Sequence, residues 1–337
     1  MDDHPPPVEK KKFLIIRLSS IGDIVLTTPI IRSIFKQIPN VEIQFLVKKE
    51  FKIVVESNPY ISKIHEFENG NKNLIQELKQ ENFDYIIDLQ KNQKSKRIVR
   101  RIGVPFLSFH KLNFKKWLLV YLKINILPLI HIVDRYFESI SKIGVQNDFD
   151  GLDFFIPEET SFDYEDLPAV FEDGYVTIAL GSMHGTKRIP TDKIIEISKI
   201  LHYPVVLLGG KDVILEGEEI ASAIPDRVYN ACGKINLYQS ASLIDKSSCL
   251  LTSDTGLMHI GAALKVPVAV MWGNTVPEFG MYPYMPKHSE LFRNFETTTL
   301  YCRPCSKLGF KKCPKRHFKC MKSLDTQEIA DWINTFK

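Results

Sequence analysis

The sequence predicts an α/β protein with two parallel-sheet domains. Three observations support this: a chain of 337 residues, short apolar strands followed by glycine turns and helices, and a second start of that pattern near residue 175. At roughly 150 residues per domain, the length favours two domains, each with its own core. Continuous apolar strands that alternate with helices are typical of a parallel sheet covered on both faces.

The first half shows this pattern from residue 13. The run FLIIRL (13–18) predicts a strand, SSIGD predicts a turn, and helical spacing follows from Ile24, with a kink at Pro29. VEIQFLV (41–47) and DYIIDL (84–89) predict two further strands. A run of six cations follows the second of these, within KNQKSKRIVRR.

The second half repeats the pattern. We expect a strand at YVTIAL, a loop at GSMHGTKR and a helix from Thr191. Further strands are expected at residues 204–210, 248–254 and 266–273, with a helix in TGLMHIGAAL. In parallel sheets, ligands bind at the carboxyl ends of strands. The chemistry should therefore lie in the turns after Leu18, Leu180, Gly210 and Asp254.

These elements divide the chain into five predicted segments. They are a disordered tail (1–10), an N-terminal domain (11–160), an acidic linker (161–174), a C-terminal domain (175–322) and a C-terminal helix (323–337). The linker is poorly periodic, as hinges often are.

The composition is that of an ordinary globular protein, and it gives no sign of a membrane-spanning or secreted one. Hydrophobic residues make up 44% and charged residues 25%, which is ordinary for a globular protein. No window approaches the ~20 apolar residues needed to cross a bilayer, and no secretory signal follows the first residues. We therefore expect cytoplasmic residence. The basic runs indicate either a solvated face or an anionic partner, and nucleic acid ranks last because no nucleic-acid-binding motif is present.

SDTGLMH is the first candidate site. Asp254 and Thr255 lie where a strand ends and a helix begins, so unpaired N–H groups and a partial positive charge face outward. Gly256 lets a ligand approach the backbone, and the arrangement suits a diphosphate. The alternative is that Asp254 only caps the helix. His259 reaches the same ligand or packs within the protein.

GSMHGTKR and SSIGD are the other candidates. Lys187 would offset the charge that develops on a departing diphosphate, or it is an exposed loop lysine. Asp23 would take the proton from an attacking hydroxyl, or it is the N-cap of a helix that begins at Ile24. Ser20 and Gly22 of the same turn, with Lys91 and Lys94, are expected on the acceptor side.

The tail holds four cysteines, Cys302, Cys305, Cys313 and Cys320, with His317 between the last two. Their spacing resembles a zinc site, but the second pair is not a clean CxxC, and we favour packed, metal-free thiols. Disulfides are rare in cytoplasmic proteins. Cys232 and Cys249 are expected to be buried.

KLNFKKWLLVYLKI combines Trp117 and Tyr121 with lysines. It is either an interfacial helix on a membrane surface or a packed helix with a basic outer face. The expected acceptor-side cations and this segment together suggest peripheral association with a membrane surface.

The motifs together resemble glycosyltransferase family nine, the ADP-heptose:lipopolysaccharide heptosyltransferases. IIRLSSIGDIVLTTP, TKRIP, SDTGLMHIGAAL and the cysteine-rich tail occur in the family's order over about 300 residues. The resemblance implies a GT-B architecture, in which two Rossmann-like domains face each other across a cleft. It implies that the N-terminal domain (11–160) binds the acceptor, that the C-terminal domain (175–322) binds the nucleotide-sugar donor, and that the C-terminal helix (323–337) packs back toward the N-terminal domain. It also implies inverting transfer of heptose from ADP-heptose to an anionic, lipid-linked saccharide, without a metal or cofactor, by an enzyme that associates peripherally with the cytoplasmic face of the inner membrane.

The resemblance also implies roles for single residues. Asp23 corresponds to the catalytic base and Lys187 to the cation on the donor diphosphate. The other implied donor contacts are Ser182, Met183, Ile235, Asp254, Thr255, Gly256, Leu257 and His259. Two departures are visible: Ile189 replaces the usual Trp of the KRW-type motif, and the ribose-binding glutamate has only Lys211, Asp212 and Glu216 as candidate counterparts.

Two other functions remain open. A sugar-nucleotide epimerase would need an acid/base set for breaking and remaking bonds on one substrate, and none is apparent. A catalytically silent protein that binds glycolipid or scaffolds envelope assembly is also conceivable. The presence of both Asp23 and Lys187 argues against it.

Overall fold

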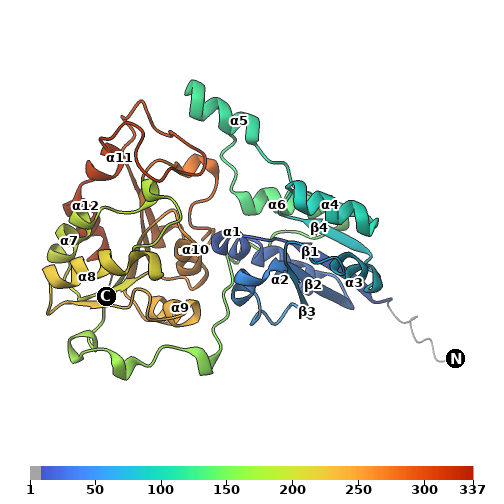
Figure 1. Cartoon of the computed structure of the whole chain (residues 1–337), viewed down its shortest axis with the longest axis horizontal. Coiled ribbons are helices and arrows are strands. Elements are labelled where there is room, and N and C mark those ends of the chain that lie inside the picture. The colour runs from blue at the N-terminus through green and yellow to red at the C-terminus, as the bar shows by residue number, and fades with distance from the viewer. Residues whose placement is uncertain (1–8, 337) are drawn as a thin grey trace. The chain divides into compact units, whose positions relative to one another are not determined.

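The computed structural model describes residues 9–336 and divides them into two compact units. The first runs up to Lys111 and includes Ile132–Asp150, and the second comprises Leu112–His131 and the chain from Gly151 onward. Each is an α/β unit, as Figure 1 shows. Residues 1–8 of the expected disordered tail lie outside the described residues, so that expectation stays a prediction.

The first unit contains a five-stranded parallel sheet with the order β3-β2-β1-β4-β5. The strands are β1 (Lys11–Ile16), β2 (Val41–Lys48), β3 (Lys63–Phe67), β4 (Tyr85–Asp88) and β5 (Phe106–Ser108). The helices are α1 (Ile21–Val25), α2 (Thr28–Gln37), α3 (Leu74–Gln80), α4 (Gln93–Ile102) and α6 (Ile132–Ile140). Helix α2 packs against α6, and α3 packs against α4.

Strand β1 is central, and its side chains are buried on both faces from Phe13 to Ile16. That burial explains why the strand is continuously apolar in sequence. The helix expected after Ile24 is two helices rather than one kinked helix. Pro29 lies in the first turn of α2, where its missing N–H breaks no helical hydrogen bond.

The second unit contains a six-stranded parallel sheet with the order β11-β10-β9-β6-β7-β8. The strands are β6 (Val176–Ala179), β7 (Val205–Leu208), β8 (Val228–Asn230), β9 (Cys249–Ser253), β10 (Val268–Trp272) and β11 (Phe292–Glu296). The helices are α5 (Asn113–Trp117), α7 (Thr191–Ile200), α8 (Ile214–Ala223), α9 (Leu237–Asp245), α10 (Gly256–Ala263), α11 (Lys319–Lys322) and α12 (Thr326–Ile333).

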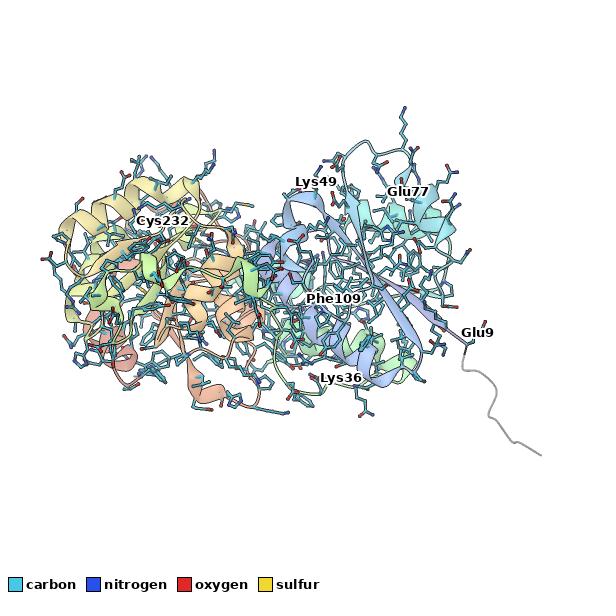
Figure 2. The ribbon with its side chains drawn as sticks, turned by 90° about the horizontal axis from the view of Figure 1, so that it is seen from below. Glu9, Lys36, Lys49, Glu77, Phe109 and Cys232 are labelled. Carbon is cyan, nitrogen blue, oxygen red and sulfur yellow. The ribbon has the colours of Figure 1, made fainter. Side chains whose placement is uncertain are left out.

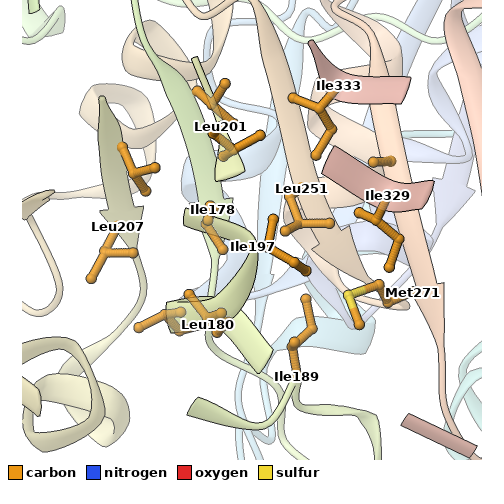
Figure 3. Close-up of a cluster of buried hydrophobic side chains, with 14 of the residues drawn as sticks. Ile178, Leu180, Ile189, Ile197, Leu201, Leu207, Leu251, Met271, Ile329 and Ile333 are labelled. Carbon is orange, nitrogen blue, oxygen red and sulfur yellow. The ribbon is translucent and has the colours of Figure 1, made fainter. Parts of the chain in front are cut away.

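Hydrophobic clusters occupy both faces of this sheet, because alternate residues of each strand point to opposite sides. Ile178 and Leu251 pack with α7 and α12 in one cluster, shown in Figure 3. Ala179 and Leu250 belong to the cluster on the other face. The two expected buried cysteines, Cys232 and Cys249, belong to these strands and their ends and are buried as predicted.

Two segments belong to the second unit, although the sequence analysis placed them before it. In residues 112–131, Leu119 and Val120 are buried against Val276 and Phe279. The stretch from Gly151 to Gly174 covers the end of the expected N-terminal domain and the acidic linker. It also packs on the second unit, through buried Phe162 and Phe171. Such contacts are remote in sequence, so local periodicity carries no sign of them.

The last helix, α12, packs against α7 within the second unit. Its expected approach to the N-terminal domain stays a prediction. None of the helices between residues 9 and 336 is both long enough and apolar enough to span a membrane.

Candidate active site

Asp23 lies at the third position of α1, just beyond the carboxyl end of β1. Its Oδ1 is 2.6 Å from Nη2 of Arg17. Its Oδ2 accepts hydrogen bonds from the Ser20 hydroxyl (3.2 Å) and the Ser20 backbone N–H (3.4 Å). The N-cap of α1 is Ser20. The alternative that Asp23 is the N-cap of a helix from Ile24 is therefore wrong, because the helix begins earlier.

Arg17 is the residue that the sequence analysis missed. Its Nη1 donates to the Leu89 carbonyl (2.6 Å) and to the Tyr136 hydroxyl (3.3 Å), and its Nε donates to the Ser19 carbonyl (2.9 Å). Burial lowers the pKa of the guanidinium, but Asp23, Tyr136 and Asp88 together outweigh that effect, so the pKa is raised overall. The only sequence signal is a cation that directly follows the apolar run FLII of β1.

The turn after β4 is hydrogen-bonded to the loop that carries Asp23 and fixes its position. Gln90 Oε1 accepts hydrogen bonds from the backbone N–H groups of Leu18 (2.8 Å) and Ser19 (3.3 Å). Lys111 Nζ donates to the Gln90 carbonyl at 2.8 Å. Burial and the nearby Arg17 lower the pKa of Lys111. The loop that carries Asp23 is therefore fixed by neighbouring strand ends rather than by α1 alone.

The expected acceptor-side residues lie in different parts of the first unit. Ser20 and Gly22 are beside Asp23 at the start of α1. Lys91 Nζ donates to the Phe109 carbonyl, whereas Lys94 Nζ donates to Asn69 Oδ1 at 3.0 Å, after β3. The two lysines thus have different partners within the first unit.

In the second unit, Lys187 and Asp254 form a close ion pair. Lys187 Nζ is 2.6 Å from Asp254 Oδ2, and the Thr275 hydroxyl donates to the same oxygen at 2.9 Å. These residues follow β6, β9 and β10, which are neighbours in the sheet. Their carboxyl ends therefore converge, and the structure brings together two of the residues expected at the donor site.

Helix α10 begins next to this pair. Its N-cap is Thr255, and Gly256 is its first residue. Asp254 precedes the cap, so the alternative that it caps this helix is wrong. The Thr255 hydroxyl is 3.0 Å from the hydroxyl of Thr252. A helix N-terminus beside a lysine is a suitable environment for a diphosphate.

The remaining expected donor contacts surround these strand ends. Leu257 and Ile235 pack at the edge of the core on the α9–α10 side, and His259 is buried within α10. Met183 is exposed, whereas Ser182 is half-buried and its carbonyl accepts from Arg188 Nε at 3.0 Å.

Arg188 also binds both acidic candidates for the ribose contact. It pairs with Asp212 and, at 3.2 Å, with Glu216. Arg188 thus contacts both the loop after β6 and the residues after β7.

The cysteine-rich tail supports the Lys187–Asp254 pair indirectly, through contacts of Arg303. Arg303 Nη2 donates to the Thr275 carbonyl (2.9 Å), its Nε donates to the Gly273 carbonyl (2.8 Å), and its Nη1 is 2.6 Å from Glu296 Oε2. Thr275 in turn holds Asp254. The tail is therefore part of the support of this site, which the sequence analysis did not anticipate.

Comparison with known proteins decides the family. The model of glycosyltransferase family 9 (heptosyltransferase) matches residues 72–309, which is more than half of the chain. The chain belongs to glycosyltransferase family 9. It is therefore a glycosyltransferase, as the motifs predicted. The matched range includes the Lys187 loop and α10 but not the Asp23 loop.

Two curated heptosyltransferases align along most of the chain. Lipooligosaccharide heptosyltransferase 2 of Haemophilus influenzae is 26% identical over 327 residues, which cover 88% of this chain and 92% of the relative. Lipopolysaccharide heptosyltransferase 3 of Escherichia coli K12 is 26% identical over 314 residues, which cover 81% of this chain and 89% of the relative.

Two solved structures of glycosyltransferases share the fold. The family 9 glycosyltransferase of Veillonella parvula superposes with a TM-score of 0.77 at 21% identity and covers 97% of both chains. ADP-heptose lps heptosyltransferase II of E. coli superposes with a TM-score of 0.73 at 20% identity, covering 96% of this chain and 98% of that one. The predicted GT-B class, with two parallel-sheet α/β domains, is confirmed.

One departure from the family 9 motif has a structural explanation. Ile189, in place of the usual tryptophan, is buried in the cluster that includes α7 and α12. It packs in the core, and Arg188 occupies the surface beside Ser182 and Asp212.

The four tail cysteines are free thiols. Cys302 Sγ is 3.8 Å from His317 Nε2. Burial raises the pKa of Cys305, and it raises the pKa of Cys320 to about 11. Between residues 9 and 336, no group of three or more His, Cys, Asp or Glu side chains is arranged to hold a metal ion.

Proposed function

We propose that this family 9 enzyme transfers heptose from ADP-heptose to the core of a lipopolysaccharide or lipooligosaccharide, with inversion at the anomeric carbon. The observation that carries the proposal is the pairing of Lys187 with Asp254 at the start of α10. The names of the two full-length relatives, both heptosyltransferases, support the choice of sugar and acceptor.

The second unit supplies the donor side in this proposal. A diphosphate at the N-terminus of α10 would accept hydrogen bonds from free backbone N–H groups, next to about half a positive charge. Lys187 would then stabilise the charge that develops as the nucleoside diphosphate leaves. Ser182 and Met183 would contact the diphosphate, and Ile235 would line the base pocket.

The first unit supplies the base. Asp23 Oδ2 would remove the proton of the acceptor hydroxyl while that oxygen attacks the anomeric carbon and the bond to the diphosphate breaks on the opposite face. Attack from the face opposite the leaving group inverts the centre. Arg17 Nη2, 2.6 Å from Asp23 Oδ1, would hold the carboxylate in a fixed orientation during this step.

We also propose that the enzyme associates peripherally with the cytoplasmic face of the inner membrane, through α5 and the turn after it. Phe114, Trp117 and Tyr121 are 69%, 43% and 66% exposed. Their rings lie next to one another, with centroids 6.3 and 5.5 Å apart. Buried Leu119 and Val120 anchor the segment on the second unit. Exposed aromatic rings beside lysines suit a headgroup region.

Three lysines of this segment already contact other groups of the protein. Lys111 donates to Gln90 in the first unit, and Lys116 lies over the Phe279 ring at 5.1 Å. Lys123 donates to the carbonyls of Val120 and Pro304. Membrane affinity should therefore depend more on the rings than on these three cations.

Liposome co-sedimentation tests the membrane proposal. Replacing Phe114, Trp117 and Tyr121 with Ser should abolish binding to anionic vesicles at low salt. The matched control replaces Tyr301 and Leu308, which are exposed apolar residues elsewhere on the second unit, and should bind like wild type. Equal binding by all three proteins would reject the proposed surface.

A donor panel tests the transfer reaction. Purified enzyme is incubated with a lipid A–Kdo acceptor and ADP-heptose, ADP-glucose or UDP-glucose, and products are read by mass spectrometry. We expect one added heptosyl residue with ADP-heptose and little product otherwise. Product with another donor would overturn the choice of sugar. Donor converted without acceptor would indicate epimerase-type chemistry, and binding without product would indicate a silent protein.

A further inference from the structure

The turn that carries Lys187 is held by a segment that is remote in sequence. This turn, Gly185–Lys187, is a single turn of 3-10 helix after β6. Lys187 Nζ extends from it to Asp254 Oδ2, 2.6 Å away. One turn of helix is not stable on its own, so the position of the lysine depends on what packs against the turn.

Thr186, in the middle of the turn, binds the cysteine-rich tail with both its backbone and its hydroxyl. Its backbone N–H donates to the Phe310 carbonyl at 3.0 Å. Its hydroxyl oxygen accepts from the Phe310 N–H at 2.8 Å and donates to Asn274 Oδ1 at 2.9 Å. Thr186 is only 2% exposed. The hydroxyl therefore connects the turn to two other segments, the tail and the turn after β10.

Asn274 extends this connection to the partner of Lys187. It is buried, and its Nδ2 has no hydrogen-bond partner among residues 9–336, so that end of the side chain supplies no alternative anchor. The next residue, Thr275, donates its hydroxyl hydrogen to Asp254 Oδ2. The Thr186 hydroxyl thus joins the support of Lys187 to the support of Asp254.

The tail approaches the turn so closely that two glycines are required. A Cβ at Gly185 would overlap the carbonyl oxygen of Lys311. Gly309 has a φ of +129°, and a Cβ there would lie 2.5 Å from the Cβ of His184. Neither position has room for a side chain. The contact between tail and turn is therefore specific in shape as well as in hydrogen bonds.

The turn after β7 is supported in a different way, by its neighbour in the sheet. A Cβ at Gly209 would lie 3.3 Å from the sulfur of Cys232, which follows β8 and is labelled in Figure 2. The Gly233 N–H donates to the Gly209 carbonyl at 2.9 Å. These contacts join adjacent strand ends. Phe310, in contrast, comes from beyond β11, the last strand in sequence.

We propose that Thr186 is a positioning residue for Lys187, through which the tail acts on the donor diphosphate. The proposal deepens the function proposed above and rests on it. Thr186 is buried and would act on the donor only through Lys187, by fixing the turn from which the lysine reaches the departing diphosphate. A displacement of about 1 Å at a catalytic group can lower a rate by about 100-fold.

Thr186→Val tests this role, because valine has nearly the same shape but no hydroxyl. It leaves the Phe310 N–H and Asn274 Oδ1 without the partner that they share. Thr186→Ser keeps the hydroxyl. Asn274→Ala removes one of the two partners, and this milder variant decides the question should Thr186→Val not fold.

The matched control is Thr177→Val. Thr177 is fully buried near the amino end of β6, whereas the Lys187 turn follows the carboxyl end of that strand. Its hydroxyl is 3.1 Å from the hydroxyl of Ser247. Both valine variants lose a buried hydrogen bond, so both should lose similar stability. A rate loss confined to Thr186→Val would therefore not reflect stability.

The first measurement is steady-state heptosyl transfer with ADP-heptose varied. We expect Thr186→Val to lower kcat about tenfold or more and to change the KM for donor by less than about threefold, because Lys187 acts mainly on the charge of the departing group. Asn274→Ala should show a smaller loss of the same kind. Thr186→Ser and Thr177→Val should stay within about threefold of wild type.

The second measurement combines these changes with Lys187→Met. In that background Thr186→Val should lower kcat by less than about twofold more, because its effect passes through the lysine. Calorimetry with ADP needs no transfer reaction, and ADP carries the charge of the departing group. Thr186→Val should weaken ADP binding about fivefold when Lys187 is present and should not change it in Lys187→Met.

Equal rate losses in Thr186→Val and Thr177→Val would overturn the proposal, as would a full further loss in the Lys187→Met background. Thr186→Ser as slow as Thr186→Val would also overturn it, because the hydroxyl would then be irrelevant. A wild type that transfers no heptose, but whose ADP affinity depends on Thr186 only when Lys187 is present, would reject the proposed reaction while leaving the positioning role in place.

Discussion

Arg17 Nη2 lies 2.6 Å from Asp23 Oδ1. The Arg17 side chain is 9% exposed, whereas that of Asp23 is 26% exposed. A buried cation therefore holds one carboxylate oxygen, while the carboxylate as a whole stays accessible. That arrangement gives a general base a fixed orientation and leaves it able to meet a substrate hydroxyl.

Replacing Arg17 should slow the chemical step without weakening the binding of the donor. We expect Arg17→Met to lower kcat about 10- to 100-fold and to leave the KM for donor unchanged, because the base loses its orientation. Arg17→Lys should be intermediate, since a lysine keeps the charge but not the planar fork. The pH profile of kcat should also shift in Arg17→Met. An unchanged profile would restrict Arg17 to a structural role.

Substitutions of Lys187 and Asp254 should have coupled effects on kcat/KM for the donor. Lys187→Met should reduce kcat/KM for the donor by about 100-fold, because a charge on the departing diphosphate is no longer offset. Asp254→Asn should have a smaller effect, and the double variant should lose less than the sum of the two, since the residues are paired. Additive losses would show that the pair does not act as a unit.

Much of this fold follows from local patterns. The runs at β1, β2, β6 and β9 were predicted to within a residue or two, because buried parallel strands are continuously apolar. The convergence of Lys187 and Asp254 was also expected, since both follow strands of one parallel sheet.

Other features depend on contacts that are remote in sequence. Arg303 supports Thr275 from 28 residues away, and Arg17 meets Tyr136 from 119 residues away. Leu119 and Val120 attach their segment to the second unit. None of these relations has a period or motif in the sequence.

The tail is expected to be metal-free. In the metal-free chain, burial and then the neighbouring cysteines raise the pKa of Cys305 and Cys320, so zinc, which is bound by thiolates, would first have to displace their protons. Elemental analysis of protein purified without chelator should therefore find far less than one metal per chain, and chelator should not change the melting temperature. About one zinc or iron per chain, removed only with loss of folding, would contradict this.

His65 should make stability depend on pH. It is buried on β3, with Nε2 2.6 Å from Gln44 Oε1, and burial and then Lys63 lower its pKa below the usual 6.5. Between the unfolded and folded pKa, the unfolded chain binds the additional proton. The free energy of unfolding therefore falls as the pH drops below about 6.5, by at most ~1.4 kcal/mol per unit.

The comparison variant for this effect is His65→Gln, which keeps a hydrogen-bonding side chain but does not titrate. Urea unfolding at pH 5.5 and 7.5 should show a smaller difference between the two pH values in this variant than in wild type. An identical pH dependence in both proteins would assign the effect to other groups.

The most direct test of the account is the rate of heptosyl transfer by wild type and by Asp23→Asn, with ADP-heptose and a lipid A–Kdo acceptor. The substitution keeps the size of the side chain and removes the basic carboxylate. We predict measurable transfer by wild type, a loss of at least about 100-fold in kcat for Asp23→Asn, and unchanged affinity for ADP-heptose. A variant that transfers heptose at nearly the wild-type rate would contradict the assignment of Asp23 as the base, and a wild type that transfers none would contradict the proposed function.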